Sequence, residues 1–145
     1  MDINSLERFV KAQENTYETA LSEIKNGKKE THWMWFIFPQ LRGLGTSSMS
    51  NIYGISGLEE AKAYLKHPVL SKRLYKICHE LLEHKDKSVY KIFGDIDAMK
   101  LKSSMTLFAL VDECYDEFNE VLMCFFDYDF CPVTEDLIKE QSLPR

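Results

Sequence analysis

Residues 5–26 have the sequence SLERFVKAQENTYETALSEIKN, and the spacing of their apolar side chains decides the fold class. Those side chains stand at Leu6, Phe9, Val10, Tyr17, Ala20, Leu21 and Ile24. Intervals of three and four residues place side chains on one face of an α-helix. Gly27 follows Asn26 and is typical of the position where a helix ends. The stretch therefore predicts one long amphipathic helix.

After this helix, apolar residues at helical spacing and residues typical of helix starts recur along the chain. Ser47 is a suitable N-cap, and Ser56-Gly57-Leu58-Glu59 fits a capping box, in which serine and glutamate satisfy each other's exposed amide groups. Pro68 is favoured at a first helical position. We expect helices from Ser47 through Tyr53, from Ser56 to Lys66 or His67, and from Pro68 through Leu81. After a turn around residues 85–87, we expect a short helix that ends near Gly94, followed by helices from Asp95 or Asp97 to about Leu110, over 114–126, and from Thr134 through Ile138.

Residues 31–45, THWMWFIFPQLRGLG, form the most aromatic segment of the chain. Its part up to Phe38 is largely apolar. A helical turn there would end before Pro39, because the residue that precedes a proline avoids helical backbone. A short aromatic strand is the alternative, and periodicity does not distinguish the two.

The chain has 145 residues, a length typical of one domain. It contains no internal repeat, no low-complexity linker and no convincing alternating strand pattern. Helices of unequal length with short connections favour an orthogonal arrangement over an up-and-down one. We therefore predict an all-α fold, a single domain over residues 1–145 built as a compact orthogonal bundle of about seven helices.

Charge is unevenly distributed along the chain, whose formal net charge is −5. From Ser103 to Ile138 there is no Lys or Arg, and nine Asp or Glu residues fall in that span. Nucleic-acid binding requires neutralisation of phosphates, so this acidic third argues against a nucleic-acid partner. Residues 62–102 are relatively basic and leave room for a small anionic ligand.

Other features predict a cytoplasmic protein without membrane association. No apolar run approaches the ~18 residues that cross a bilayer, and the first residues, MDINSLE, lack the pattern of a signal peptide. Cys78, Cys114, Cys124 and Cys131 form no C-x-x-C pair and have apolar neighbours, as reduced core cysteines do.

Polar groups at the margins of the aromatic segment form the first half of a candidate site. His32 has the chemistry of a general base or of a hydrogen-bond donor to substrate. Gln40 and Arg42 follow the segment on its other side. Trp33 or Trp35 can stack on a ligand ring, although packing in the core is the simpler expectation for both.

Residues 100–108, KLKSSMTLF, supply the second half of that site. At about 100° per residue, Lys100, Ser103 and Ser104 share an arc beside the apolar stripe of a helix. An ammonium group beside two hydroxyls suits a phosphate or a carboxylate, while an ordinary polar helix face is the simpler explanation. The remaining histidines have no zinc-ligand spacing, so neither a metal nor a cofactor is expected.

The segment HWMWFIFPQLRGLG, residues 32–45, resembles the signature of a widespread bacterial domain of unknown function, whose members are sometimes mislabelled calpastatin. The downstream elements that agree are Tyr53-Gly54-Ile55, Glu60-Ala61, Tyr64-Leu65, His67-Pro68-Val69-Leu70 and residues 100–108. The resemblance extends from about Leu6 to Leu137. It implies a single, mostly helical domain and no particular activity.

Two classes of function follow from these features. The first is a domain with a pocket for a small anionic, ring-bearing ligand, such as a nucleotide or an ADP-ribose derivative. In an enzyme version, a hydrolase or lyase, His32 moves a proton while Arg42 and Lys100 bind the anion; a binding version lacks turnover. The rival is a protein-interaction module whose acidic helix around 112–120 docks a basic partner. Whether the protein is an enzyme, and its oligomeric state, stay open.

Overall fold

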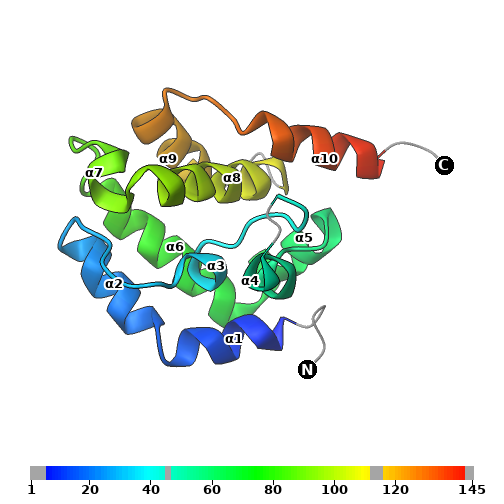
Figure 1. The fold of residues 1–145 in the computed structure, drawn as a ribbon, viewed down its shortest axis with the longest axis horizontal. Helices are drawn as coiled ribbons and strands as arrows, with labels where there is room; N and C mark the ends of the chain where they lie inside the picture. The colour runs from blue at the N-terminus through cyan, green and yellow to red at the C-terminus, as the bar shows by residue number, and fades with distance from the viewer. Residues whose placement is uncertain (1–5, 45–46, 112–115, 143–145) are drawn as a thin grey trace.

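The computed structural model describes residues 6–44, 47–111 and 116–142, and this part of the chain is helical without strands (Figure 1). Its ten helices are α1 (Glu7–Glu14), α2 (Tyr17–Lys25), α3 (Met34–Ile37), α4 (Ser48–Tyr53), α5 (Leu58–Lys66), α6 (Pro68–Leu82), α7 (Val89–Phe93), α8 (Asp95–Val111), α9 (Asp116–Phe126) and α10 (Pro132–Ser142). The all-α prediction is confirmed, whereas the expected number of helices is wrong. The division of residues 5–26 into two helices and the short helix in the aromatic segment account for much of the difference. The orthogonal arrangement stays a prediction.

The long helix predicted over residues 5–26 is instead two helices, α1 and α2, which meet at Asn15 and Thr16. Thr16 leaves the helical conformation at φ −127°, and its hydroxyl donates to the carbonyl of Ala12 at 2.6 Å. Asn and Thr side chains compete with helical backbone hydrogen bonds in this way. The apolar period continues across the break, because both helices pack against α6.

Helix α8 lies in the middle of the fold, in contact with α3, α5, α7, α9 and α10 (Figure 1). Residues 103–109 are all buried, so its side chains are enclosed around the whole circumference. A helix without a polar face belongs to the centre of a core. The ring of Phe108 packs between those of Tyr64 and Phe118, with centroids 5.3 and 5.6 Å away.

The aromatic segment forms the short helix α3, so the strand alternative is wrong. This helix ends before Pro39, as the proline predicts. After it, Leu41 forms a parallel β-bridge with Ile55, and backbone hydrogen bonds of 2.7 and 2.9 Å flank the bridge. The bridge holds the chain after α3 against the chain that connects α4 to α5.

The helix starts follow the predicted caps in one case and not in another. Ser47 caps α4 as predicted, since its hydroxyl accepts from the amide of Ser50 at 3.2 Å. The predicted capping box of Ser56 and Glu59 is wrong, because Glu59 is exposed and the amide of Ser56 donates to Glu60 at 2.8 Å. A tertiary ion pair, described below, turns Glu60 inward.

The last helix is longer than the sequence predicts. α10 begins at Pro132, a residue suited to a first helical position, and ends at Ser142. Thr134 is therefore inside the helix and buried, and its predicted role as a cap is wrong. Within the described residues, no helix has the length and apolar character needed to span a membrane.

The cysteines differ from one another in exposure. Cys78 is buried in the core as predicted, but Cys124 and Cys131 are partly exposed, so the core assignment is wrong for these two. Cys114 lies outside the described residues. Over the described chain, His, Cys, Asp and Glu side chains form no group of three or more suited to a metal ion.

Candidate functional site

The two segments predicted to form a site meet where α3 contacts α8. The ammonium group of Lys100 lies 3.9 Å from the ring centroid of the half-buried Trp35. A cation at this distance from an aromatic ring is attracted by about 0.5–2 kcal/mol, depending on its exposure to water. Lys100 and Trp35, 65 positions apart in the sequence numbering, are therefore direct neighbours.

A second lysine and an aspartate join this contact. Lys29 lies 4.9 Å from the ring centroid of Trp33. Asp97 forms ion pairs with Lys29 at 3.0 Å and with Lys100 at 3.4 Å, and the two lysine side chains are 6% and 23% exposed. We call Lys29, Trp33, Trp35, Asp97 and Lys100 the lysine–tryptophan cluster. In it, two ammonium groups share one carboxylate.

Glu23 of α2 fixes the loop that leads into the cluster. Its carboxylate accepts hydrogen bonds from the amides of Glu30 and Thr31, the hydroxyl of Thr31 and the indole N–H of Trp33, at 2.6–3.0 Å. Burial opposes ionisation of Glu23, but these donors outweigh it and lower its pKa to about 2. Sequence reasoning missed Glu23, although its position beside Ala20 and Ile24 places it on the apolar face of α2.

The other predicted residues of the aromatic segment have different surroundings. Trp33 is 1% exposed and bound to Glu23, so it is a core residue and offers no free face to a ligand. His32 is exposed, and its ring forms no hydrogen bond or ion pair within the described part of the chain. Gln40 is largely buried, and its backbone carbonyl accepts from the amide of Ile55 at 2.9 Å.

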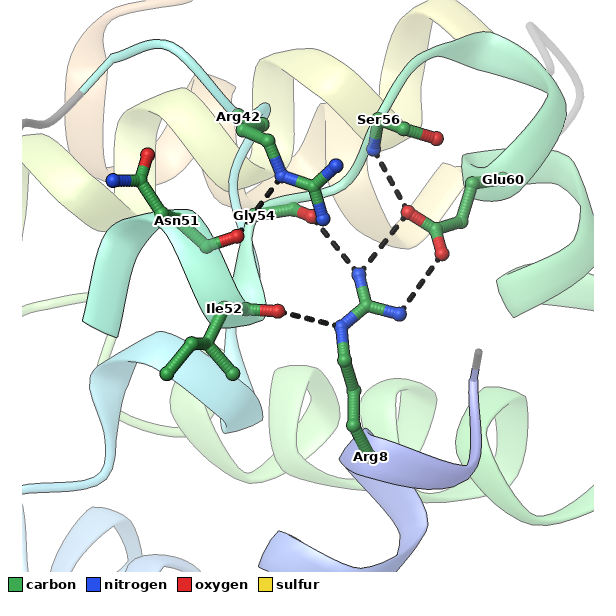
Figure 2. Close-up of polar contacts among 7 residues, drawn as sticks. All are labelled: Arg8, Arg42, Asn51, Ile52, Gly54, Ser56 and Glu60. Carbon is green, nitrogen blue, oxygen red and sulfur yellow. Dashed lines mark hydrogen bonds and ion pairs between the residues drawn. The ribbon is translucent and has the colours of Figure 1, made fainter. Parts of the chain in front are cut away.

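Arg42 belongs to a separate group of polar contacts around α4 (Figure 2). Its Nε donates to the carbonyl of Asn51 at 2.9 Å. Gly54 lies beside it, and a Cβ added to Gly54 would stand 2.7 Å from the Cα of Arg42 and 2.6 Å from the carbonyl oxygen of Ser50. Arg42 is therefore engaged in holding the chain around α4.

At the centre of Figure 2 lies Arg8, whose side chain is fully buried. Its guanidinium group donates to the carbonyls of Ile52 and Gly54 at 2.7 and 2.9 Å and to both oxygens of Glu60 at 3.0 and 3.2 Å. This ion pair fastens α1 to α4 and α5. The sequence gives no local signal for it, because Arg8 resembles a residue on the solvent face of an amphipathic helix.

The three predicted residues of α8 do not gather in one place. Lys100 contacts Trp35, whereas the hydroxyl oxygen of Ser103 lies 3.1 Å from the carbonyl of Met99 and 3.4 Å from the sulfur of Cys131, either of which can accept its single hydrogen. Ser104 is fully buried, and its hydroxyl has no hydrogen-bond partner within the described residues. Lys100 belongs to the part of α8 that reaches solvent, whereas residues 103–109 are buried on every side, so the three side chains have different neighbours.

Cys131 is a chemically interesting residue that sequence reasoning missed. It stands directly before α10 and is partly exposed. Burial raises the pKa of its thiol, but hydrogen bonds from Ser103 and from the start of α10 outweigh that effect and lower the pKa overall. The available signal was the sequence Cys-Pro, since proline often opens a helix and a helix start favours a thiolate.

Comparison with known proteins places the domain in a family. The family model described as "Protein of unknown function (DUF1810)" matches residues 3–138. The chain belongs to this family. The crystal structure of the conserved hypothetical protein Rv1873 from Mycobacterium tuberculosis is similar, with 42% sequence identity and a TM-score of 0.92 over 95% of this chain and 99% of that one. No curated protein matches the chain.

The clefts of this DUF1810 domain include three that are lined by described residues and contain none of the predicted site residues. The first, of 640 Å³, lies between the end of α6 and α9. Another, of 240 Å³, lies where α1 and α2 meet α6 and is lined by Gln13, Glu14, Tyr17, Glu18, Lys72, Arg73 and Lys76. The pocket with an aromatic floor and a cationic rim that the sequence predicts at the lysine–tryptophan cluster stays a prediction.

Proposed function

We propose that this DUF1810 domain binds a small anionic, ring-bearing ligand, such as a nucleotide or an ADP-ribose derivative, at the lysine–tryptophan cluster. The supporting observation is that Lys29 and Lys100 share Asp97 beside the partly exposed ring of Trp35. One carboxylate neutralises only one of two ammonium groups. A phosphate or carboxylate of a ligand would supply the missing negative charge.

In this proposal, the two partly exposed members of the cluster have separate tasks. Lys100 keeps 23% of its side chain open to solvent, which is enough for an ammonium group to reach an anion. Trp35 presents part of its indole beside that ammonium, and half-buried aromatic rings are common stacking surfaces for ligand rings. Lys29 is almost fully buried and holds Asp97 in place.

We place Arg42 and Ser103 outside the proposed site, because Arg42 binds the carbonyl of Asn51 and Ser103 contacts Cys131. Ser104 is also left out, because its side chain is fully buried. Gln40 stays a candidate through its place in the segment after α3. His32 is exposed and lacks an orienting partner within the described residues, and a general base is normally held by one. The binding version of the hypothesis is therefore favoured over the hydrolase or lyase version.

A ligand screen tests the proposal. The melting temperature is measured with ATP, ADP-ribose, a sugar phosphate and inorganic phosphate, since a ligand at about 100 times its Kd stabilises the folded state by about 2.7 kcal/mol. Calorimetric titration of any stabilising compound is then repeated with Lys100→Ala and with Lys62→Ala. Lys62 is an exposed lysine of α5 whose only described ion pair is a weak contact with Glu59.

We expect Lys100→Ala to weaken binding by ~10-fold or more, through the lost charge-assisted contact, and Lys62→Ala to leave it unchanged. Equal weakening by both variants, or no stabilisation by any of the anions, would contradict the proposal. Turnover of the bound compound that His32→Ala abolishes, with binding retained, would support the enzyme version instead.

A further inference from the structure

The 640 Å³ cleft between α6 and α9 shares no residue with the lysine–tryptophan cluster. It is lined by His79, Leu82, Glu83, Lys85, Asp86, Glu117, Glu120, Met123 and Cys124. These residues come from the end of α6, the turn that follows it and one face of α9. Of the acidic stretch 112–120 in the sequence, residues 112–115 lie outside the described residues, so the cleft is argued from Glu117 onward.

The charged groups of the cleft are mostly acidic. Four carboxylates, those of Glu83, Asp86, Glu117 and Glu120, face one ammonium group, that of Lys85. The ring of His79 lies 3.2 Å from a carboxylate oxygen of Glu117. A cleft with this excess of carboxylates attracts cationic partners and repels nucleic acid and anionic lipid surfaces.

Apolar surface continues from the acidic cleft along α9. Met123 is 51% exposed and lines both this cleft and a shallower one of 210 Å³, which Asn119, Glu120 and Tyr128 complete. Tyr128 is 52% exposed. Exposed methionine and tyrosine side chains next to charged groups are typical of surfaces that receive another protein.

We infer that this joint surface docks a basic amphipathic segment of a partner protein. Lysine or arginine side chains of the segment enter the acidic cleft, and its apolar side chains cover Met123 and Tyr128. A polyamine or a simple cation would satisfy the carboxylates but leave both apolar side chains exposed. A helix with one basic and one apolar face matches the two halves of the surface together, as in other helix-in-groove complexes.

Fluorescence anisotropy with synthetic peptides tests the inference. The probe is a labelled helix-forming peptide with lysines on one face and leucines on the other. Matched peptides carry glutamate in place of each lysine or serine in place of each leucine, and spermine serves as a competitor. Binding is measured to the 145-residue chain and to variants of it with Glu117→Lys plus Glu120→Lys, or with Met123→Ser.

Matched control variants separate the cleft from general electrostatics. Glu59→Lys plus Glu140→Lys makes the same change in net charge at exposed sites elsewhere, and Met49→Ser removes another exposed methionine. We expect the Lys/Leu peptide to bind, the cleft variants to weaken it by ~10-fold or more, and the controls to match the original chain. Backbone amide shifts in NMR should change along α9 and the end of α6.

Three results would overturn the inference. Equal losses in the cleft variants and the controls would show that net charge alone drives binding. Equal affinity for the Lys/Ser peptide, or full displacement by spermine at equal concentration, would show a site for cations without an apolar contribution. Absence of binding of the Lys/Leu peptide would contradict the docking site. The anion screen does not involve this surface, so its result tests the proposed function independently of this inference.

Discussion

Glu23 organises more of its surroundings than its position on a helix suggests. Its four hydrogen bonds tie α2 to the loop before α3 and orient the indole of Trp33. Lys29 of the same loop then lies over that indole and beside Asp97. The lysine–tryptophan cluster is consequently assembled by the fold before any ligand arrives.

Replacement of Glu23 by glutamine tests this role. The pKa of Glu23 falls from 4.5 in the unfolded chain to about 2 in the folded one, so its ionised form stabilises the fold above pH 4.5. That contribution is lost as the pH falls from 4.5 toward 2. Glu23→Gln should therefore lower the free energy of unfolding by about 1–3 kcal/mol at pH 7 and flatten its decline in acid. Urea unfolding at several pH values measures both effects.

The control for that experiment is Glu18→Gln, an exposed carboxylate on the same helix. This substitution should leave the decline of the unfolding free energy in acid nearly unchanged. If Glu18→Gln and Glu23→Gln changed the unfolding free energy alike at every pH, the loop contacts of Glu23 would not matter for stability.

Cys131 should be the most reactive of the described thiols. Its pKa is lowered and it is partly exposed, whereas burial raises the pKa of the Cys78 thiol. Since the thiolate is the reactive form, iodoacetamide should modify Cys131 first near neutral pH. Ser103→Ala should slow that reaction and move its midpoint to higher pH. Mass spectrometry of alkylated peptides gives the rates, and faster modification of Cys78 would contradict the assignment.

At the scale of the helices, the ion pair of Arg8 with Glu60 joins α1 to α4 and α5 (Figure 2). Both side chains are almost fully buried, at 0% and 7% exposure. A buried ion pair adds little to the free energy of unfolding compared with a pair of apolar side chains in its place. Removal of only one partner, however, leaves an uncompensated charge in the interior and destabilises the fold. The attachment of α1 thus depends on both residues being present.

Arg8→Met should lower the free energy of unfolding by about 3–5 kcal/mol, because Glu60 then loses its buried partner. The double variant Arg8→Met with Glu60→Met should recover part of that loss. Lys62→Met serves as the control, since its exposed contact with Glu59 is expected to contribute about 1 kcal/mol or less. Urea denaturation of the original chain, Arg8→Met, Glu60→Met and the double variant gives the coupling energy; a double variant as unstable as the sum of the two single changes would argue against the ion pair.

For the molecule as a whole, local patterns predicted the helical class and several helix ends, such as those at Ser47 and before Pro39. They failed where a tertiary contact overrides a local preference. The amide of Ser56 donates to Glu60 and not to Glu59, the partner in a local capping box. Glu60 is held in this position by Arg8, which lies 52 positions away in the sequence but is in contact with it in the fold.

The candidate site, too, could be predicted from local sequence only in part. Apolar spacing and unusual composition located the segments that carry Trp35 and Lys100, and these two side chains are in contact. The partners that complete the cluster, Lys29 and Asp97, gave no signal, because a charged side chain in a sequence does not reveal which distant group will neutralise it. Arg42 was assigned to the site by proximity in sequence and instead contacts α4.

The enclosure of α8 restricts where members of the family can diverge. Its first turns approach solvent, with Ile96 74% and Met99 44% exposed, while residues 103–109 are buried and have no room for larger or charged replacements. Sequence changes within the family should therefore accumulate on the connections wrapped around this helix, and its buried turns should vary least.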